Sequence, residues 1–169
     1  MDMHMRLQSH QWVHRDPDWV AAGVAGLAAG AVLMVIELLW PALVGGSDSW
    51  HAARMIAAIV MGPGPLQSNG FALDVVLVAL VTHYALGVLF GIALGFVIAG
   101  FRLDSSTGLV LVTGAVFGLA LYLINFYGMT RVFTWFAEIR GWPMAINHVL
   151  FGMVAAWLYR FLERRLGSP

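Results

Sequence analysis

Long apolar runs alternate along the chain with short polar connections. Four of these runs are long enough to cross the hydrocarbon core of a bilayer, which needs about 20 residues in a helix. They cover residues 19–40, 71–101, 108–126 and 143–162. The pattern predicts an all-α, polytopic membrane protein with four transmembrane helices.

Tryptophans mark the two ends of the first apolar run. Trp19 and Trp40 would lie roughly 30 Å apart at about 1.5 Å per residue, which is the spacing of the two aromatic belts of a membrane. A long tail of mixed charge precedes the run and no small-residue cleavage site follows it, so we interpret it as a retained helix and not as a signal peptide. Asp16, Pro17 and Asp18 predict the start of this helix.

The two longer connections each contain a helical pattern. Residues 49–61 form one such segment, and the Gly-Pro-Gly-Pro stretch at residues 62–65 excludes a helix interior directly after it. Between the third and fourth spans, apolar residues recur at helical spacing over residues 132–139. The sequence therefore predicts two short outer helices that lie in the membrane interface.

Composition supports the membrane assignment and excludes several functions. Of the 169 residues, 60% are hydrophobic, and the mean hydropathy is +0.82. The formal net charge is zero, so the chain lacks the basic surface that binding to nucleic acid requires. There is no cysteine, which excludes disulfides, thiolate metal ligands and iron–sulfur clusters. No Ser-His-Asp order, phosphate loop, dinucleotide fingerprint or HExxH motif is present, so no catalytic residue is predicted.

The distribution of arginines predicts the orientation in the membrane. Four spans put both termini on one side, and six of the nine arginines fall on that side. The six are Arg6, Arg15, Arg102, Arg160, Arg164 and Arg165, and the other three are Arg54, Arg131 and Arg140. We therefore expect both termini in the cytoplasm. Residues 1–15 would form a polar cytoplasmic tail, and residues 16–169 a single transmembrane domain.

The two halves of the chain resemble each other. Residues 26–37 align with residues 114–125, so that Glu37 matches Asn125. In the same way His83, which is followed by glycines at four-residue spacing, matches His148. The alignment predicts two tandem hairpin repeats over residues 16–101 and 107–165, related by an axis along the membrane normal.

The four aligned polar residues share helix faces with small residues. Small residues at four-residue spacing allow close helix contact in lipid, and both histidines begin such a stripe. Glu37 and Asn125 follow glycines at seven-residue spacing. All four side chains should therefore point into the bundle and form one buried polar site, made of Glu37, His83, Asn125 and His148, in its outer half.

Ionisable groups inside a membrane are rare and tend to be functional, so this site has several interpretations. It could be a structural hydrogen-bond network across helices. Two facing histidines, His83 and His148, could instead be the axial ligands of haem b. The same histidines with Glu37 could hold a divalent metal ion, and a His and Glu constellation could pass protons. The absence of a catalytic motif favours a non-catalytic packing or accessory component of a membrane assembly, and haem or metal binding or proton handling is the alternative.

Several short stretches resemble the YagU-type bacterial inner-membrane proteins. These stretches are Val81-Thr82-His83, Gly87-Val88-Leu89-Phe90, Ile124-Asn125-Phe126 with Gly128, and His148 ahead of Arg160 and Glu163-Arg164-Arg165. The resemblance runs from the first span to the carboxyl end, and the loops of this chain are shorter. It implies four spans and a bacterial inner-membrane location, and it brings no established chemistry. The expected partners are the lipid bilayer and a second copy or a larger membrane complex.

Overall fold

The computed structural model describes residues 16–44 and 48–166, and every regular element within these ranges is helical. The predicted tail at residues 1–15 lies outside the described part. Four helices are long and apolar enough to cross a membrane, and a shorter one follows the first of them. The five α-helices are α1 (Trp19–Val44), α2 (His51–Met61), α3 (Leu73–Phe101), α4 (Thr107–Leu123) and α5 (Trp142–Leu166). The chain is thus a multi-pass helical membrane protein.

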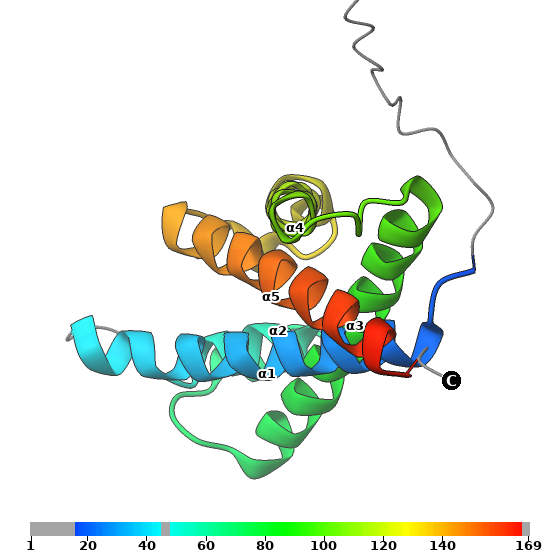
Figure 1. Ribbon diagram of the computed structural model, residues 1–169. Coiled ribbons are helices and arrows are strands. Elements are labelled where there is room, and N and C mark those ends of the chain that lie inside the picture. Colours follow the sequence, from blue (N-terminus) through cyan, green and yellow to red (C-terminus); the bar gives the residue numbers. More distant parts are fainter. Residues whose placement is uncertain (1–15, 45–47, 167–169) are drawn as a thin grey trace, which may run out of the picture.

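The long helices pack in two pairs. Helix α1 lies against α3, helix α4 lies against α5, and the pairs meet where α1 contacts α5 (Figure 1). Helix α5 therefore lies between α1 and α4, while α3 crosses α1. The start of α1 and the end of α5 lie at the same end of the bundle, because Gly95 of α3 contacts both Ala22 and Tyr159 there.

Glycines allow the backbones to approach closely in both pairs. A Cβ atom built on Gly26 of α1 would lie 2.8 Å from the Cα atom of Gly91 in α3. A Cβ atom on Gly114 of α4 would lie 2.7 Å from the carbonyl carbon of Gly152 in α5. Real Cβ atoms do not come this near to backbone, so each contact requires glycine. Gly26 and Gly114, which the alignment pairs, thus each lie directly against the backbone of the facing helix.

The core is built mainly from alanines and medium-sized apolar side chains. Ala25, Leu94, Val110 and Tyr159, each from a different long helix, are almost completely buried in it. Large apolar side chains such as Leu89 cover the outer surface of the same helices. This arrangement suits a bundle whose outside is solvated by lipid chains.

Several helix ends differ from the sequence-based expectation. Helix α1 begins at Trp19, where the carboxylate of Asp18 accepts a hydrogen bond from the backbone N–H of Ala21 at 2.9 Å, so Asp18 is the cap. The helix continues past Pro41 to Val44, because a proline in the last turns removes only one backbone hydrogen bond.

The second short outer helix is not a single α-helix. Residues 124–137 form a π-helical turn, η2 (Ile124–Gly128), and two short 3₁₀ helices, η3 (Met129–Arg131) and η4 (Thr134–Ala137). Phe133 adopts φ −105° and ψ 76°, which lies outside the helical region and separates the last two turns. The helical spacing over residues 132–139 was therefore a misleading signal. The first short segment is α2, which packs on the start of α3.

Candidate functional site

A cavity of about 370 Å³ lies between the two helix pairs. Its wall is almost entirely apolar, and five phenylalanines contribute to it: Phe90, Phe126, Phe133, Phe136 and Phe151. Four polar side chains also line it, and they are the four that the sequence singles out: Glu37 from α1, His83 from α3, Asn125 from η2 and His148 from α5. The structure thus brings all four candidate residues to one cavity.

The two polar residues of the second helix pair contact each other. Nδ2 of Asn125 lies 3.2 Å from Nε2 of His148, and Nδ1 of His148 lies 2.9 Å from the carbonyl oxygen of Met144. Since a carbonyl can only accept, Nδ1–H of His148 donates to Met144, and Nε2 then accepts from the amide of Asn125. Both ring nitrogens of His148 are therefore engaged.

The π-helical turn determines where Asn125 lies. A π-turn adds one residue to a helical turn and so rotates the side chains that follow it, and such turns are frequent at functional sites. Asn125 is the second residue of this turn, at the end of α4. The rings of Tyr122 and Phe126 pack edge-on against the imidazole of His148 beside it. The pair of Asn125 and His148 is thus held by aromatic contacts as well as by hydrogen bonds.

His83 makes a different contact in the first helix pair. Its Nε2–H donates to the carbonyl oxygen of Gly30 at 2.9 Å. Gly30 lies on the neighbouring helix α1, and a Cβ atom there would lie 3.6 Å from Nε2 of His83, in ordinary van der Waals contact. Nδ1 of His83 has no hydrogen-bond partner among the described residues, so one ring nitrogen stays available.

Glu37 lines the same cavity without a protein partner. It is half-buried on α1, and its carboxylate forms no hydrogen bond or ion pair with the described side chains of residues 16–40 and 48–163. A carboxylate in apolar surroundings is costly when it is unpaired. Glu37 is therefore the one polar group of the four whose hydrogen-bonding capacity is entirely unused.

The geometry does not favour the metal and haem interpretations. In the described part of the chain, no three His, Asp or Glu side chains converge closely enough to hold a metal ion, and this includes His83, His148 and Glu37. An axial ligand of haem needs a free ring nitrogen, while both nitrogens of His148 already have protein partners. Iron could bind only if Asn125 withdrew.

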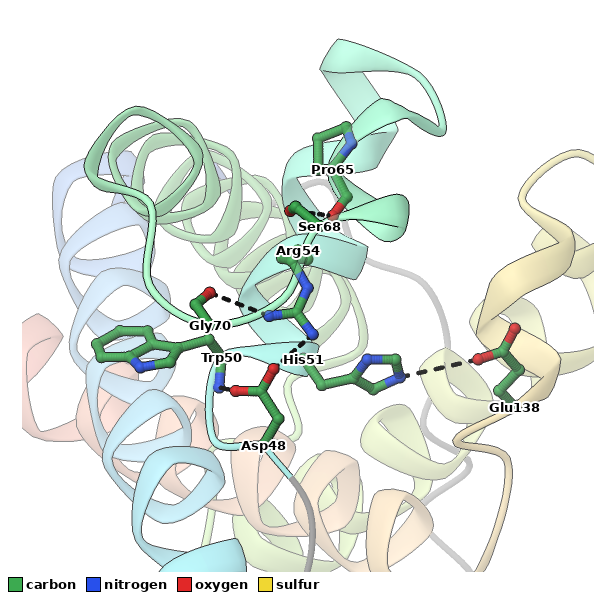
Figure 2. A network of polar contacts seen from close by, with 8 residues as sticks. All are labelled: Asp48, Trp50, His51, Arg54, Pro65, Ser68, Gly70 and Glu138. Atoms are coloured by element: carbon green, nitrogen blue, oxygen red, sulfur yellow. Dashed lines mark hydrogen bonds and ion pairs between the residues drawn. The ribbon is translucent and has the colours of Figure 1, made fainter.

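One side of the cavity wall consists of short segments that pack on each other. Ala52 and Ile56 of α2 line the cavity, and so do Phe133 just before η4 and Phe136 within it. The indole N–H of Trp135 donates to the carbonyl oxygen of Met55 at 3.1 Å and links the two segments. His51 and Glu138 also approach to 3.8 Å across the same junction (Figure 2).

A buried arginine organises the segment around α2. Arg54 is only 4% exposed, and its guanidinium lies 2.6 Å from the carboxylate of Asp48 and donates to the carbonyl oxygen of Gly70 at 3.1 Å (Figure 2). The backbone N–H of Trp50 and the guanidinium of Arg54 lower the pKa of Asp48. These contacts join the two ends of the connection between α1 and α3.

Sequence reasoning assigned no such role to these residues. The sequence identified Arg54 only as one of three arginines on the outer side. Trp135 and Glu138 belonged to the predicted interfacial segment at residues 132–139. The one signal that could have identified Arg54 is its position within an otherwise apolar segment, where an unpaired charge would be costly.

The cavity wall includes two side chains that also reach the outer surface of the bundle, one on α3 and one on η2 after α4. Leu89 on α3 and Ile124 on η2 both line the cavity and are 57% and 55% exposed. Helices α3 and α4 make few contacts with each other. A lipophilic molecule in the bilayer could therefore reach the cavity laterally.

Comparison with known proteins found no matching protein-family model, no matching curated protein and no matching solved structure.

Proposed function

We propose that this protein is a non-catalytic accessory protein of the bacterial inner membrane and that it holds a small lipophilic molecule in its cavity. The observation that carries the proposal is the meeting of four polar side chains from four helical segments in one otherwise apolar cavity. Binding pockets for small molecules combine a mostly apolar wall with a few placed polar groups, and they measure about 300–1,000 Å³. The two exposed lining residues, Leu89 and Ile124, support entry from the bilayer.

The remaining sequence-based expectations form part of the same proposal. The tandem repeat is supported by the corresponding glycine contacts in the two helix pairs. The arginine bias supports cytoplasmic termini, in which case the short segments beside the cavity lie on the outer face. The YagU-type resemblance rests on the motifs alone. The exposed apolar helix faces suit contact with lipid, with a second copy, or with a larger membrane complex.

Native mass spectrometry with a neutral aromatic probe, triphenylphosphine oxide, tests the proposal. Ala52→Phe places a ring in the cavity wall, while Val60→Phe adds the same ring on the exposed side of the same helix. We expect a one-to-one adduct with the wild-type protein and with Val60→Phe, and a much weaker adduct with Ala52→Phe. Equal adducts for both variants would contradict the proposal, and so would a wild-type protein that binds neither this probe nor a charged probe of the same size.

The haem alternative has a separate test. A haem b held by His83 and His148 would give the purified protein a strong visible absorption spectrum. Because Asn125 and Met144 engage both nitrogens of His148, we expect a protein that stays colourless when it is expressed with excess haem. A Soret band that is lost in both His83→Gln and His148→Gln would establish haem binding instead.

A further inference from the structure

We infer that the cavity selects lipophilic cations: molecules with an apolar, aromatic-sized body and a single positive charge. This inference rests on the proposed function, since it names the class of ligand that the same cavity takes. The observation behind it is the pairing of an unpartnered carboxylate, Glu37, with a wall of phenylalanine rings.

The charges at the cavity favour a positive ligand. Glu37 is the only side chain of the lining that can carry a negative charge, and no arginine belongs to that lining in the described part of the chain. The chain has no lysine. A bound cation would supply the partner that the Glu37 carboxylate lacks, whereas a bound anion would be repelled by it.

The aromatic wall points in the same direction. Phenylalanine faces attract cations, and this attraction is stronger where water is excluded. Phe90 and Phe151 come from the long helices, and Phe126, Phe133 and Phe136 come from the segment between α4 and α5, so rings approach the cavity from both helix pairs. Phenylalanine-rich surroundings suit delocalised or quaternary cations, which carry little hydration to lose.

The other polar groups do not compete for this role. Asn125 and His148 are hydrogen-bonded to each other, and His83 donates a hydrogen bond to the carbonyl oxygen of Gly30. Asn125 and His83 can still form single hydrogen bonds to a ligand, but none of the three residues offers a negative charge. Glu37 is therefore the residue expected to determine the preferred sign of charge.

Two ions of nearly the same shape and opposite charge provide the experiment. Tritiated tetraphenylphosphonium and tetraphenylborate are presented to the full-length protein in detergent, together with neutral triphenylphosphine oxide, and Ala52→Phe defines the background from micelles. The variant is Glu37→Gln. The matched control is Asp74→Asn, which removes an exposed carboxylate at the start of α3 outside the cavity.

We expect the cation to bind the wild-type protein and Asp74→Asn alike, and to bind Glu37→Gln about tenfold more weakly or worse, because a desolvated charge contact is lost. Tetraphenylborate should not bind above background. If the neutral probe or the borate binds as well as the cation, or if Glu37→Gln leaves cation binding unchanged, the cationic preference is wrong and the cavity still binds lipophiles. If no probe binds, the proposed function fails as well.

Discussion

The two helix pairs, α1 with α3 and α4 with α5, both pack through glycines, but their polar side chains differ in how they are hydrogen-bonded. In each pair, glycines bring two backbones together, and a histidine lies beside the contact. In the second pair Asn125 and Met144 engage both nitrogens of the histidine. In the first pair His83 uses one nitrogen on Gly30, and Glu37 has no partner among the described residues.

This difference distinguishes two sides of one cavity, one with hydrogen-bonded polar groups and one with an unpaired carboxylate. Hydrogen-bonded polar groups stabilise a membrane bundle, whereas an unpaired one costs stability and persists where it serves a ligand. Under the proposed function, the second pair is the structural side of the cavity and the first pair is its binding side. The four predictions below test this division, from the largest expected effect to the smallest.

The glycine contacts should be equally indispensable in both pairs. Gly26→Ala and Gly114→Ala each place a methyl group against the backbone of the facing helix, which no side-chain rotation can relieve. We expect each to lower the free energy of unfolding by about 1–3 kcal/mol or more. Thermal unfolding in detergent measures the loss.

Gly108→Ala is the control for this prediction. Gly108 lies in the first turn of α4, and a Cβ atom there meets nothing within 4 Å. Alanine favours a helix over glycine by up to about 1 kcal/mol, so the change should be neutral or stabilising. If Gly26→Ala proved as harmless as Gly108→Ala, the first pair would not be a close backbone contact.

The aligned polar residues Glu37 and Asn125 should respond to the same substitution with opposite sign. Asn125→Leu leaves Nε2 of His148 without its donor, which costs about 1–3 kcal/mol for a buried group. Glu37→Leu removes a carboxylate that has no protein partner, so it should be neutral or stabilising in the absence of ligand. Comparable losses for both variants would show that Glu37 has a structural role and would remove the contrast between the pairs.

The sequence predicted the general arrangement because membranes constrain it so strongly. A spanning helix must be about 20 apolar residues long, so each predicted span overlaps a long helix of the structure. Spacing by four and seven residues also placed Glu37, His83, Asn125 and His148 on the small-residue faces, and these faces meet at the cavity.

The features that could not be predicted from the sequence depend on contacts between distant segments. The π-turn that positions Asn125 has no local signature, and the hydrogen bond from Trp135 to Met55 joins segments far apart in the chain. The burial of Arg54 depends on Asp48 and Gly70, which approach it from the two ends of one connection. Which of two aligned polar residues has a partner is likewise a property of the assembled bundle.

The stability of the segment around α2 should depend on pH through Asp48. The pKa of Asp48 is lowered in the folded protein, so its contribution to stability is present above the unfolded pKa of about 3.9 and is lost as the pH falls through the folded value. Asp48 is 34% exposed, so screening limits this contribution to about 1 kcal/mol.

Asp48→Asn isolates this contribution. Wild-type protein should lose part of its advantage over Asp48→Asn below about pH 4, and the two should differ most near neutral pH. Thermal unfolding in detergent from pH 3 to 7 measures the difference. A constant difference across this range would mean that the ionised carboxylate does not stabilise Arg54, and that the two ends of the connection are held by Gly70 alone.

The contact between His51 and Glu138 should have the smallest effect on stability, although it connects α2 directly to the segment between α4 and α5. The atoms are 3.8 Å apart, and the side chains are 38% and 66% exposed, so the pair is weak and screened by salt. We expect Glu138→Gln to change the free energy of unfolding by less than about 0.5 kcal/mol.

Trp135→Phe breaks the neighbouring hydrogen bond to Met55 and should cost about 1 kcal/mol. If Glu138→Gln proved the more damaging of the two at high salt, where an exposed ion pair is screened, then the junction beside the cavity would depend on Glu138 for a reason other than charge.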